Sequence, residues 1–112
     1  MEYHVEKDAQ PMTAEREVAI MEAAIAKWGE PAQMIVAIEE LSELQKALCK
    51  YLRFADRYDG DDPGLGVLVN SIREEMADVS IMLSQLELIF GDVTDKEIWK
   101  LEKLARKIGV EA

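Results

Sequence analysis

Apolar residues recur at alternating spacings of three and four along most of this chain, in stretches separated by glycine and proline. An α-helix has 3.6 residues per turn, so this spacing places the apolar side chains of each stretch on one face. Four such stretches are present, and none shows the alternation typical of a strand. The sequence therefore predicts an all-α, four-helix bundle-like fold in a single domain that spans residues 1–112.

Local residues indicate where the first two helices begin and end. Residues 1–12 form a polar lead, after which Thr13 is a candidate N-cap. Gly29 is expected to end the first helix, because glycine accepts the backbone angles that close a helix. Pro31 fits the first turn of the second helix, which we expect to continue to about Phe54.

The acidic, glycine-containing stretch 56–66 predicts a loop between the second and third helices. The remaining helix starts carry capping signals. These are two alternatives for the third helix, Asp62 with Pro63 or Ser71 with Glu74, and one for the fourth, Thr94 with Glu97.

Size and composition limit the classes of function. A chain of 112 residues with 49% apolar content buries only a modest core, so we expect a homo-oligomer, either a dimer or a tetramer. The net charge of −10 argues against binding a nucleic-acid polymer. No apolar run approaches the roughly 20 residues that cross a bilayer, and no signal peptide is recognisable. We expect a cytoplasmic protein whose single cysteine, Cys49, is a buried thiol.

Two acidic clusters stand out within the helical stretches. Glu40 and Glu43 lie three residues apart in the second helix, as do Glu75 and Asp78 in the third. Side chains three apart on a helix are neighbours on one surface. If the two helices pack as antiparallel neighbours, these four carboxylates converge on a small volume.

A helical wheel places one acid of each cluster on the apolar face of its helix. The residues close to Glu40 are Gln33, Val36, Ala37, Leu44, Ala47 and Tyr51, and those close to Glu75 are Ile72, Val79, Met82, Leu83, Leu86, Ile89 and Phe90. A solvated acidic face is the ordinary alternative, but this inward position argues against it. An ionised carboxylate taken out of water is normally paired or bound to a metal. Clustered carboxylates suit Mg²⁺ or Mn²⁺, and magnesium is usually completed by substrate phosphates.

These residues resemble a known family. The matching phrases are Lys27-Trp28-Gly29, Gln33, the run 37–50 around Glu39-Glu40-x-x-Glu43, and the run 74–86 around Glu75-x-x-Asp78. They are similar to the MazG-like all-α nucleoside triphosphate pyrophosphohydrolases over roughly residues 15–108. The stretch between the two clusters is long for the pattern. The resemblance implies a MazG-type fold, and an enzyme that hydrolyses a nucleoside triphosphate to a nucleoside monophosphate and pyrophosphate.

By resemblance, Glu40, Glu43, Glu75 and Asp78 would hold Mg²⁺, and Glu39 or Glu43 would act as the catalytic base. Positively charged, aromatic and amide side chains near them are candidates for substrate binding. Lys46, Lys50 and Arg53 would meet phosphates, although each lysine also fits a solvated surface position; Trp28, Gln33 and Gln85 would contact the base, and Tyr51 and Asn70 offer further contacts. The alternative is a non-enzymatic, acidic helical module that binds a protein partner through an amphipathic face.

Overall fold

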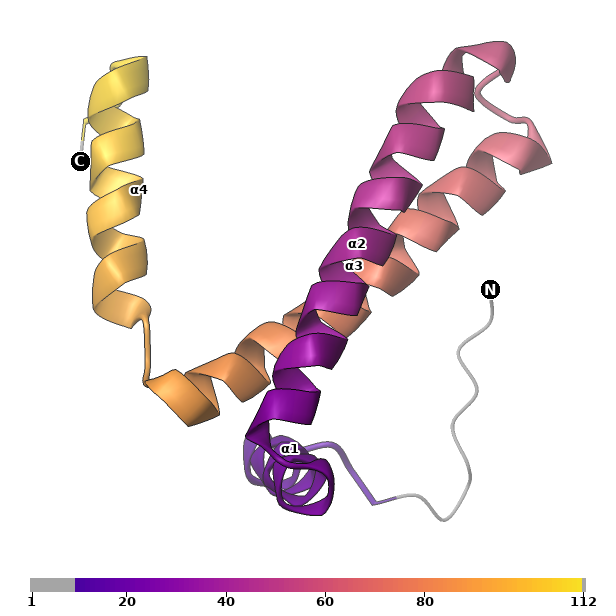
Figure 1. Ribbon diagram of the computed structural model, residues 1–112. Coiled ribbons are helices and arrows are strands. Elements are labelled where there is room, and N and C mark those ends of the chain that lie inside the picture. Colours follow the sequence, from indigo (N-terminus) through magenta and orange to yellow (C-terminus); the bar gives the residue numbers. More distant parts are fainter. Residues whose placement is uncertain (1–9, 112) are drawn as a thin grey trace.

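The computed structural model describes residues 10–111, and helices account for most of them (Figure 1). In chain order the elements are α1 (Ala14–Trp28), α2 (Glu30–Phe54), the short 3₁₀ helix η1 (Ala55–Arg57), α3 (Pro63–Phe90) and α4 (Thr94–Ile108). The all-α prediction with four α-helices is confirmed. Most of the polar lead, residues 1–9, lies outside the described residues.

The predicted junction between the first two helices is confirmed. The Thr13 hydroxyl accepts a hydrogen bond from the Arg16 amide at 3.1 Å and caps α1. Gly29 ends α1 with a φ of 89°, a backbone angle that residues with a Cβ atom rarely adopt. It also directly precedes α2, with Pro31 in the first turn. The chain therefore turns from α1 into α2 at Gly29 without a separate loop.

The loop predicted for 56–66 is shorter in the structure. Its first residues continue α2 as the 3₁₀ helix η1, and its last residues already belong to α3. Of the two candidate starts for α3, Asp62 with Pro63 is correct: the Asp62 carboxylate accepts a hydrogen bond from the Gly64 amide at 2.7 Å. Proline in the first helical turn leaves no amide unsatisfied, so cap and proline together begin the helix early.

The predicted capping box at the start of α4 is not formed. Thr94 is the first helical residue and Val93 precedes it as the N-cap. The Asp92 carboxylate instead accepts a hydrogen bond from the Thr94 amide at 2.8 Å, and hydrogen bonding with the Thr94 side chain, followed by that with its backbone amide, lowers the pKa of Asp92. An aspartate just before the helix thus supplies the acceptor that the threonine was expected to provide.

Helices α2 and α3 form an antiparallel hairpin and make the most extensive contact in the described structure. Helix α1 packs against both of them near one end of the hairpin. Helix α4 points away from the hairpin after a short turn at Gly91 and has no comparable contact with the other helices (Figure 1). Within one described chain, three helices therefore pack together and the expected four-helix bundle is not closed.

The core is small and follows the wheel faces that carry Glu40 and Glu75. Its buried apolar residues are Ala37, Leu68, Val79 and Met82, and two buried polar residues, Gln33 and Gln85, join them. On α2, the six residues that share a face with Glu40 are all buried or half-buried. On α3 the same holds for five of the seven neighbours of Glu75, whereas Leu83 and Phe90 are exposed. The inward position predicted for the two acids is confirmed.

A second apolar stripe of α2 faces outward. Ile38, Leu41 and Leu52 are 63%, 47% and 80% exposed. The prediction that Cys49 is buried is wrong, because this thiol lies beside the outward stripe and is exposed. Only α3 accompanies the second half of α2, so one side of that half is covered and the other is not (Figure 1).

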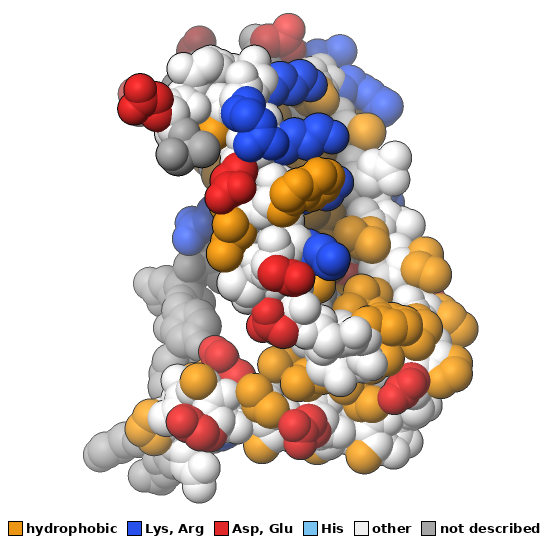
Figure 2. Space-filling view, turned by 90° about the vertical axis from the view of Figure 1, so that its left-hand side faces the viewer, with side chains coloured by type: hydrophobic (Ala, Val, Ile, Leu, Met, Phe, Trp, Pro, Cys, Tyr) orange, Lys and Arg blue, Asp and Glu red, His pale blue; other side chains and the backbone are white. Residues whose placement is uncertain are grey.

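Helix α4 carries a different charge from the rest of the molecule. It contains five basic and three acidic residues, a net charge of +2, which leaves −12 for the remainder of the chain. Figure 2 views the molecule from the side on which α4 lies, and Lys and Arg side chains gather in its upper part. None of the helices within residues 10–111 is both long enough and apolar enough to pass through a membrane.

Candidate metal centre

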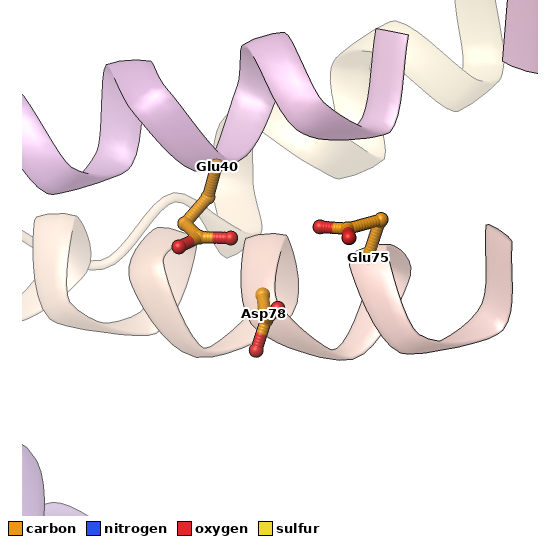
Figure 3. A group of neighbouring side chains, drawn as sticks. All are labelled: Glu40, Glu75 and Asp78. Carbon is orange, nitrogen blue, oxygen red and sulfur yellow. The ribbon is translucent and has the colours of Figure 1, made fainter. Parts of the chain in front are cut away.

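The hairpin brings three carboxylates together from two helices. Glu40 comes from α2, and Glu75 and Asp78 come from consecutive turns of α3 (Figure 3). One oxygen atom from each of the three side chains lies within 4.8 Å of those from the other two. We call these residues the acidic trio. Of the four carboxylates predicted to converge, the hairpin thus brings three together, and Glu43 is not among them.

The trio lies at the margin of the core. Glu40 and Glu75 are half-buried and Asp78 is exposed. Ala37 lies one turn before Glu40, and Val79 directly follows Asp78, and both are buried. The acids are therefore placed by the same packing that forms the core, while Asp78 keeps the cluster open to solvent.

Burial and mutual repulsion act on the same two acids. Burial raises the pKa of Glu40 most, followed by the charges of Asp78 and Glu75, a hydrogen bond with the Asp78 carboxyl and the charge of Glu43. Burial likewise raises the pKa of Glu75 most, followed by the charges of Asp78, Glu43 and Glu74. Every cause acting on these two pKa values favours the neutral form. The trio thus holds negative charge at a cost that a bound cation would remove.

The fourth predicted ligand, Glu43, stays at the edge of the cluster. It is exposed and does not belong to the group of three converging oxygens. Its charge nevertheless raises the pKa of both Glu40 and Glu75, so it lies close to the trio. Glu39 is exposed and is not among the charges that act on these two described acids. Of the two candidate bases, the structure therefore brings Glu43 near the cluster.

Three carboxylate oxygens at this separation are suited to a small divalent cation. Mg²⁺ binds oxygen at 2.0–2.1 Å, so two ligands on opposite sides of the ion are about 4.2 Å apart. Neighbouring ligands in an octahedron are only about 3.0 Å apart, so the three oxygens, which lie within 4.8 Å of one another, would have to approach by up to about 2 Å when an ion binds. Octahedral coordination would leave further positions for water or phosphate oxygens.

Two buried amides lie on one side of the trio. Gln33 precedes Glu40 by seven residues on α2, and Gln85 follows Asp78 by seven on α3. Because the helices are antiparallel, both amides are displaced in the same direction, by about 10 Å along the hairpin. Gln33 and Gln85 are 5% and 4% exposed, and the Gln85 Oε1 atom has no hydrogen-bond partner in the described structure. A buried acceptor without a partner is uncommon in folded proteins.

Basic side chains lie on the other side of the trio. Lys46, Lys50 and Arg53 follow Glu43 along α2 and are all exposed. Trp28 was expected to contact the base, and its side chain is 58% exposed at the end of α1. Tyr51 is half-buried. Asn70 donates a hydrogen bond to the Glu74 carboxylate at 3.1 Å, so its side chain is engaged within α3.

One feature near the core was not anticipated from the sequence. A cavity of about 300 Å³ lies between α1 and α3 and is lined by Ile20, Met21, Ser80 and Ser84, among others. Its only sequence signal is the pair of serines four residues apart in an otherwise apolar part of α3. None of the acidic trio lines this cavity.

The raised pKa values predict how stability depends on pH without metal. A folded state with raised carboxyl pKa values binds protons more tightly than the unfolded chain, so protonation stabilises it. This stabilisation is present below the ordinary value of 4.5 and is lost as the pH rises through the raised pKa values. We therefore expect the melting temperature in a chelator to fall over that pH interval.

The control separates the trio from the general effect of an acidic chain. Glu40→Gln should make the melting temperature less dependent on pH, whereas Glu102→Gln, which removes one charge from α4, should leave the dependence unchanged. Equal slopes in the two variants and the original protein would contradict the assignment of these pKa shifts.

Comparison with known proteins does not assign this chain to a family. The chain matches no family model, no curated protein and no solved structure.

Proposed function

We propose that this protein is a magnesium-dependent nucleoside triphosphate pyrophosphohydrolase. Hydrolysis would break the phosphoanhydride bond between the α and β phosphates and release a nucleoside monophosphate and pyrophosphate. The observation that carries the proposal is the convergence of the acidic trio, in which two of the three acids have raised pKa values. The resemblance to the MazG-like family supplies the reaction type.

The trio would hold the metal, and Mn²⁺ would also suit its oxygen ligands. The chemistry that such an ion supplies is neutralisation of triphosphate charge and activation of water. We assign Glu43 as the group that accepts the proton from the attacking water, because its charge reaches the trio while its own oxygens remain outside it. Glu39 is the less suitable base because its charge is not among those that raise the pKa of Glu40 or Glu75.

The order of residues along the hairpin fits a nucleotide. The buried amides Gln33 and Gln85 lie about 10 Å from the trio, and Lys46 and Lys50 lie in the opposite direction along α2. A base held at the amides would place its phosphates at the trio and their far end towards the lysines. The unpartnered Oε1 atom of Gln85 would accept a hydrogen bond from the base edge, with Trp28 as a further contact of the base. Arg53 would be a further contact of the phosphates.

We further propose that the active unit is a homo-oligomer in the cytoplasm and that it cleans or regulates the nucleotide pool. The second candidate is a non-enzymatic module that binds a protein partner. It is favoured by the exposed apolar side chains of α4, of which Leu101 and Ile108 are 63% and 64% exposed. The two candidates differ in whether a nucleotide is consumed.

A screen for pyrophosphate release tests the enzyme directly. The protein would be incubated with canonical and modified nucleoside triphosphates, each with Mg²⁺ and Mn²⁺. We expect release of pyrophosphate and nucleoside monophosphate in equal amounts from at least one substrate, and its loss on chelation, because the triphosphate charge is then left uncompensated. Release of inorganic phosphate alone would contradict cleavage between the α and β phosphates. A folded protein inactive on the whole panel would favour the interaction module.

A further inference from the structure

A cleft of about 550 Å³ lies where α3 meets α4. Both helices line it: α3 contributes Leu83, Leu86, Glu87 and Phe90, among others, and the start of α4 contributes Val93 and Glu97. Leu83 and Phe90 are the two residues on the Glu75 face of α3 that the hairpin leaves exposed. The cleft is therefore an uncovered apolar surface of α3 that ends against the first turn of α4.

The side of α4 that lines this cleft continues as an apolar stripe. Glu97 is followed at intervals of four, three and four by Leu101, Leu104 and Ile108, which lie on the same side of the helix. All three are exposed. None of the five basic residues of α4 lines the cleft. Helix α4 thus presents its apolar side, and not its basic residues, towards the uncovered surface of α3.

Helix α4 lacks the packing that stabilises helices of its length. It has 15 residues, and isolated helices of about 12–15 residues are only marginally stable in water. Most helices in proteins are stabilised by covering an apolar side. Beyond the turn at Gly91, α4 has no contact with the other described helices comparable to those among α1, α2 and α3 (Figure 1). Its apolar stripe therefore needs a surface to cover, and the α3 side of the cleft adjoins it.

The short link between the two helices favours a contact within one chain. Only Gly91, Asp92 and Val93 separate α3 from α4. Links of two to five residues are those that join antiparallel helices packed side by side. Such a short tether also holds α4 near α3 at an effective concentration of about the millimolar range, which exceeds that of a second copy in dilute solution.

We propose that α4 folds back at Gly91 onto α3 of the same chain and closes the cleft as an antiparallel fourth helix. Counting equally from the turn places Leu101 beside Leu83 and Leu104 beside Ser80. The movement gives up no extensive packing, because α4 has none in the open arrangement. It is independent of the proposed hydrolysis, because no member of the acidic trio lines the cleft.

One pair of side chains favours the open arrangement. Glu87 and Glu97 both line the cleft, and the same counting from the turn places them opposite one another when it closes. Two ionised carboxylates repel one another, and more strongly where water is excluded. Closure is thus a balance between apolar contact and this repulsion, and removal of one charge shifts the balance towards the closed form.

A disulfide between the two helices tests the closure. Ser80 and Leu104 are each ten residues from the end of the helix at the turn, about 15 Å along it, so their side chains meet when the helices lie side by side. Ser80→Cys with Leu104→Cys, in a Cys49→Ser background, is oxidised in dilute solution. We expect a disulfide within one chain, identified by single-chain mass on a non-reducing gel and by peptide mass spectrometry.

The matched control moves one cysteine to the other side of α4. Ser80→Cys with Glu102→Cys should form a disulfide far more slowly, because residues 102 and 104 lie on opposite sides of the helix. A disulfide between two chains as the main product would overturn the proposal, because a second copy would then cover the cleft. Equal rates for the two pairs, or no disulfide within the chain, would also overturn it.

The repulsion is tested in the same cysteine pair. Glu87→Gln should increase the rate of disulfide formation by about fivefold or more, the effect of two unit charges about 4 Å apart in water. Glu102→Gln removes a charge that does not line the cleft and should leave the rate unchanged. An unchanged rate in Glu87→Gln would overturn the register in which Glu87 meets Glu97. Pyrophosphate release is not measured, so these outcomes are separate from that of the proposed reaction.

Discussion

Glu40→Gln is expected to reduce magnesium-dependent pyrophosphate release by at least about 100-fold, the loss typical when one preorganised electrostatic group is removed. Glutamine keeps the shape of the side chain but lacks the charge that a divalent ion requires. Glu40 is the only member of the acidic trio that comes from α2, so its loss leaves both remaining acids on α3. The measurement is kcat/KM at several magnesium concentrations, with metal affinity from calorimetry.

The same substitution should act in the opposite direction on the metal-free protein. Burial and the neighbouring acids raise the pKa of Glu40, so replacing it with a neutral side chain removes an unfavourable charge. The melting temperature in chelator should therefore stay the same or rise, and the increase caused by Mg²⁺ in the original protein should disappear. A residue with a purely structural role would lower the melting temperature under both conditions.

Glu102→Gln on α4 is the matched control, since it removes an equal charge far along the sequence from the trio. It should keep the activity and the stabilisation by Mg²⁺. If Glu40→Gln still shows that stabilisation, the trio is not the metal site.

Met82→Ala is expected to lower the free energy of unfolding by about 2–5 kcal/mol. Met82 is 7% exposed, lies one turn after Asp78 and is one of the four buried apolar residues of the core. Truncation leaves a cavity that this small core cannot easily close, and a domain of this size has only about 5–15 kcal/mol of stability in total. The measurement is urea denaturation followed by circular dichroism.

The matched control uses the same residue type on the same helix. Met76 is 55% exposed on α3, so Met76→Ala should change the free energy of unfolding by no more than about 0.5 kcal/mol. Both variants are to be compared at one protein concentration, because association would make stability depend on it. An equal loss in the two variants would show that the hairpin core is not centred on Met82.

Much of the local structure could be predicted because the responsible interactions are short-range. Thr13 and Gly29 act within one helical turn, and their roles were predicted correctly. The start of α3 was ambiguous because Asp62 and Ser71 both precede suitable partners, and only the structure selects Asp62. The capping box at Thr94 was predicted incorrectly because Asp92, two residues earlier, supplies the acceptor.

The candidate site was predictable only in part, for a related reason. The three-residue spacing of Glu75 and Asp78 and the wheel position of Glu40 are properties of single helices, and they sufficed to predict convergence across a hairpin. Which of the four acids come closest depends on the register between α2 and α3, and this leaves Glu43 at the edge. The orphaned acceptor of Gln85 likewise follows from packing and has no sequence signal.

The sequence by itself determined the four helices, most of their ends and the inward position of Glu40 and Glu75, because helical periodicity and capping are local. Only the tertiary structure decided which apolar stripe is covered. Helical periodicity predicts that an apolar face of a helix is covered, but not which segment covers it. Helix α3 packs on the face of α2 that carries Glu40. The second apolar stripe of α2, which includes Leu41, is therefore exposed, as are Cys49 and nearly all of α4.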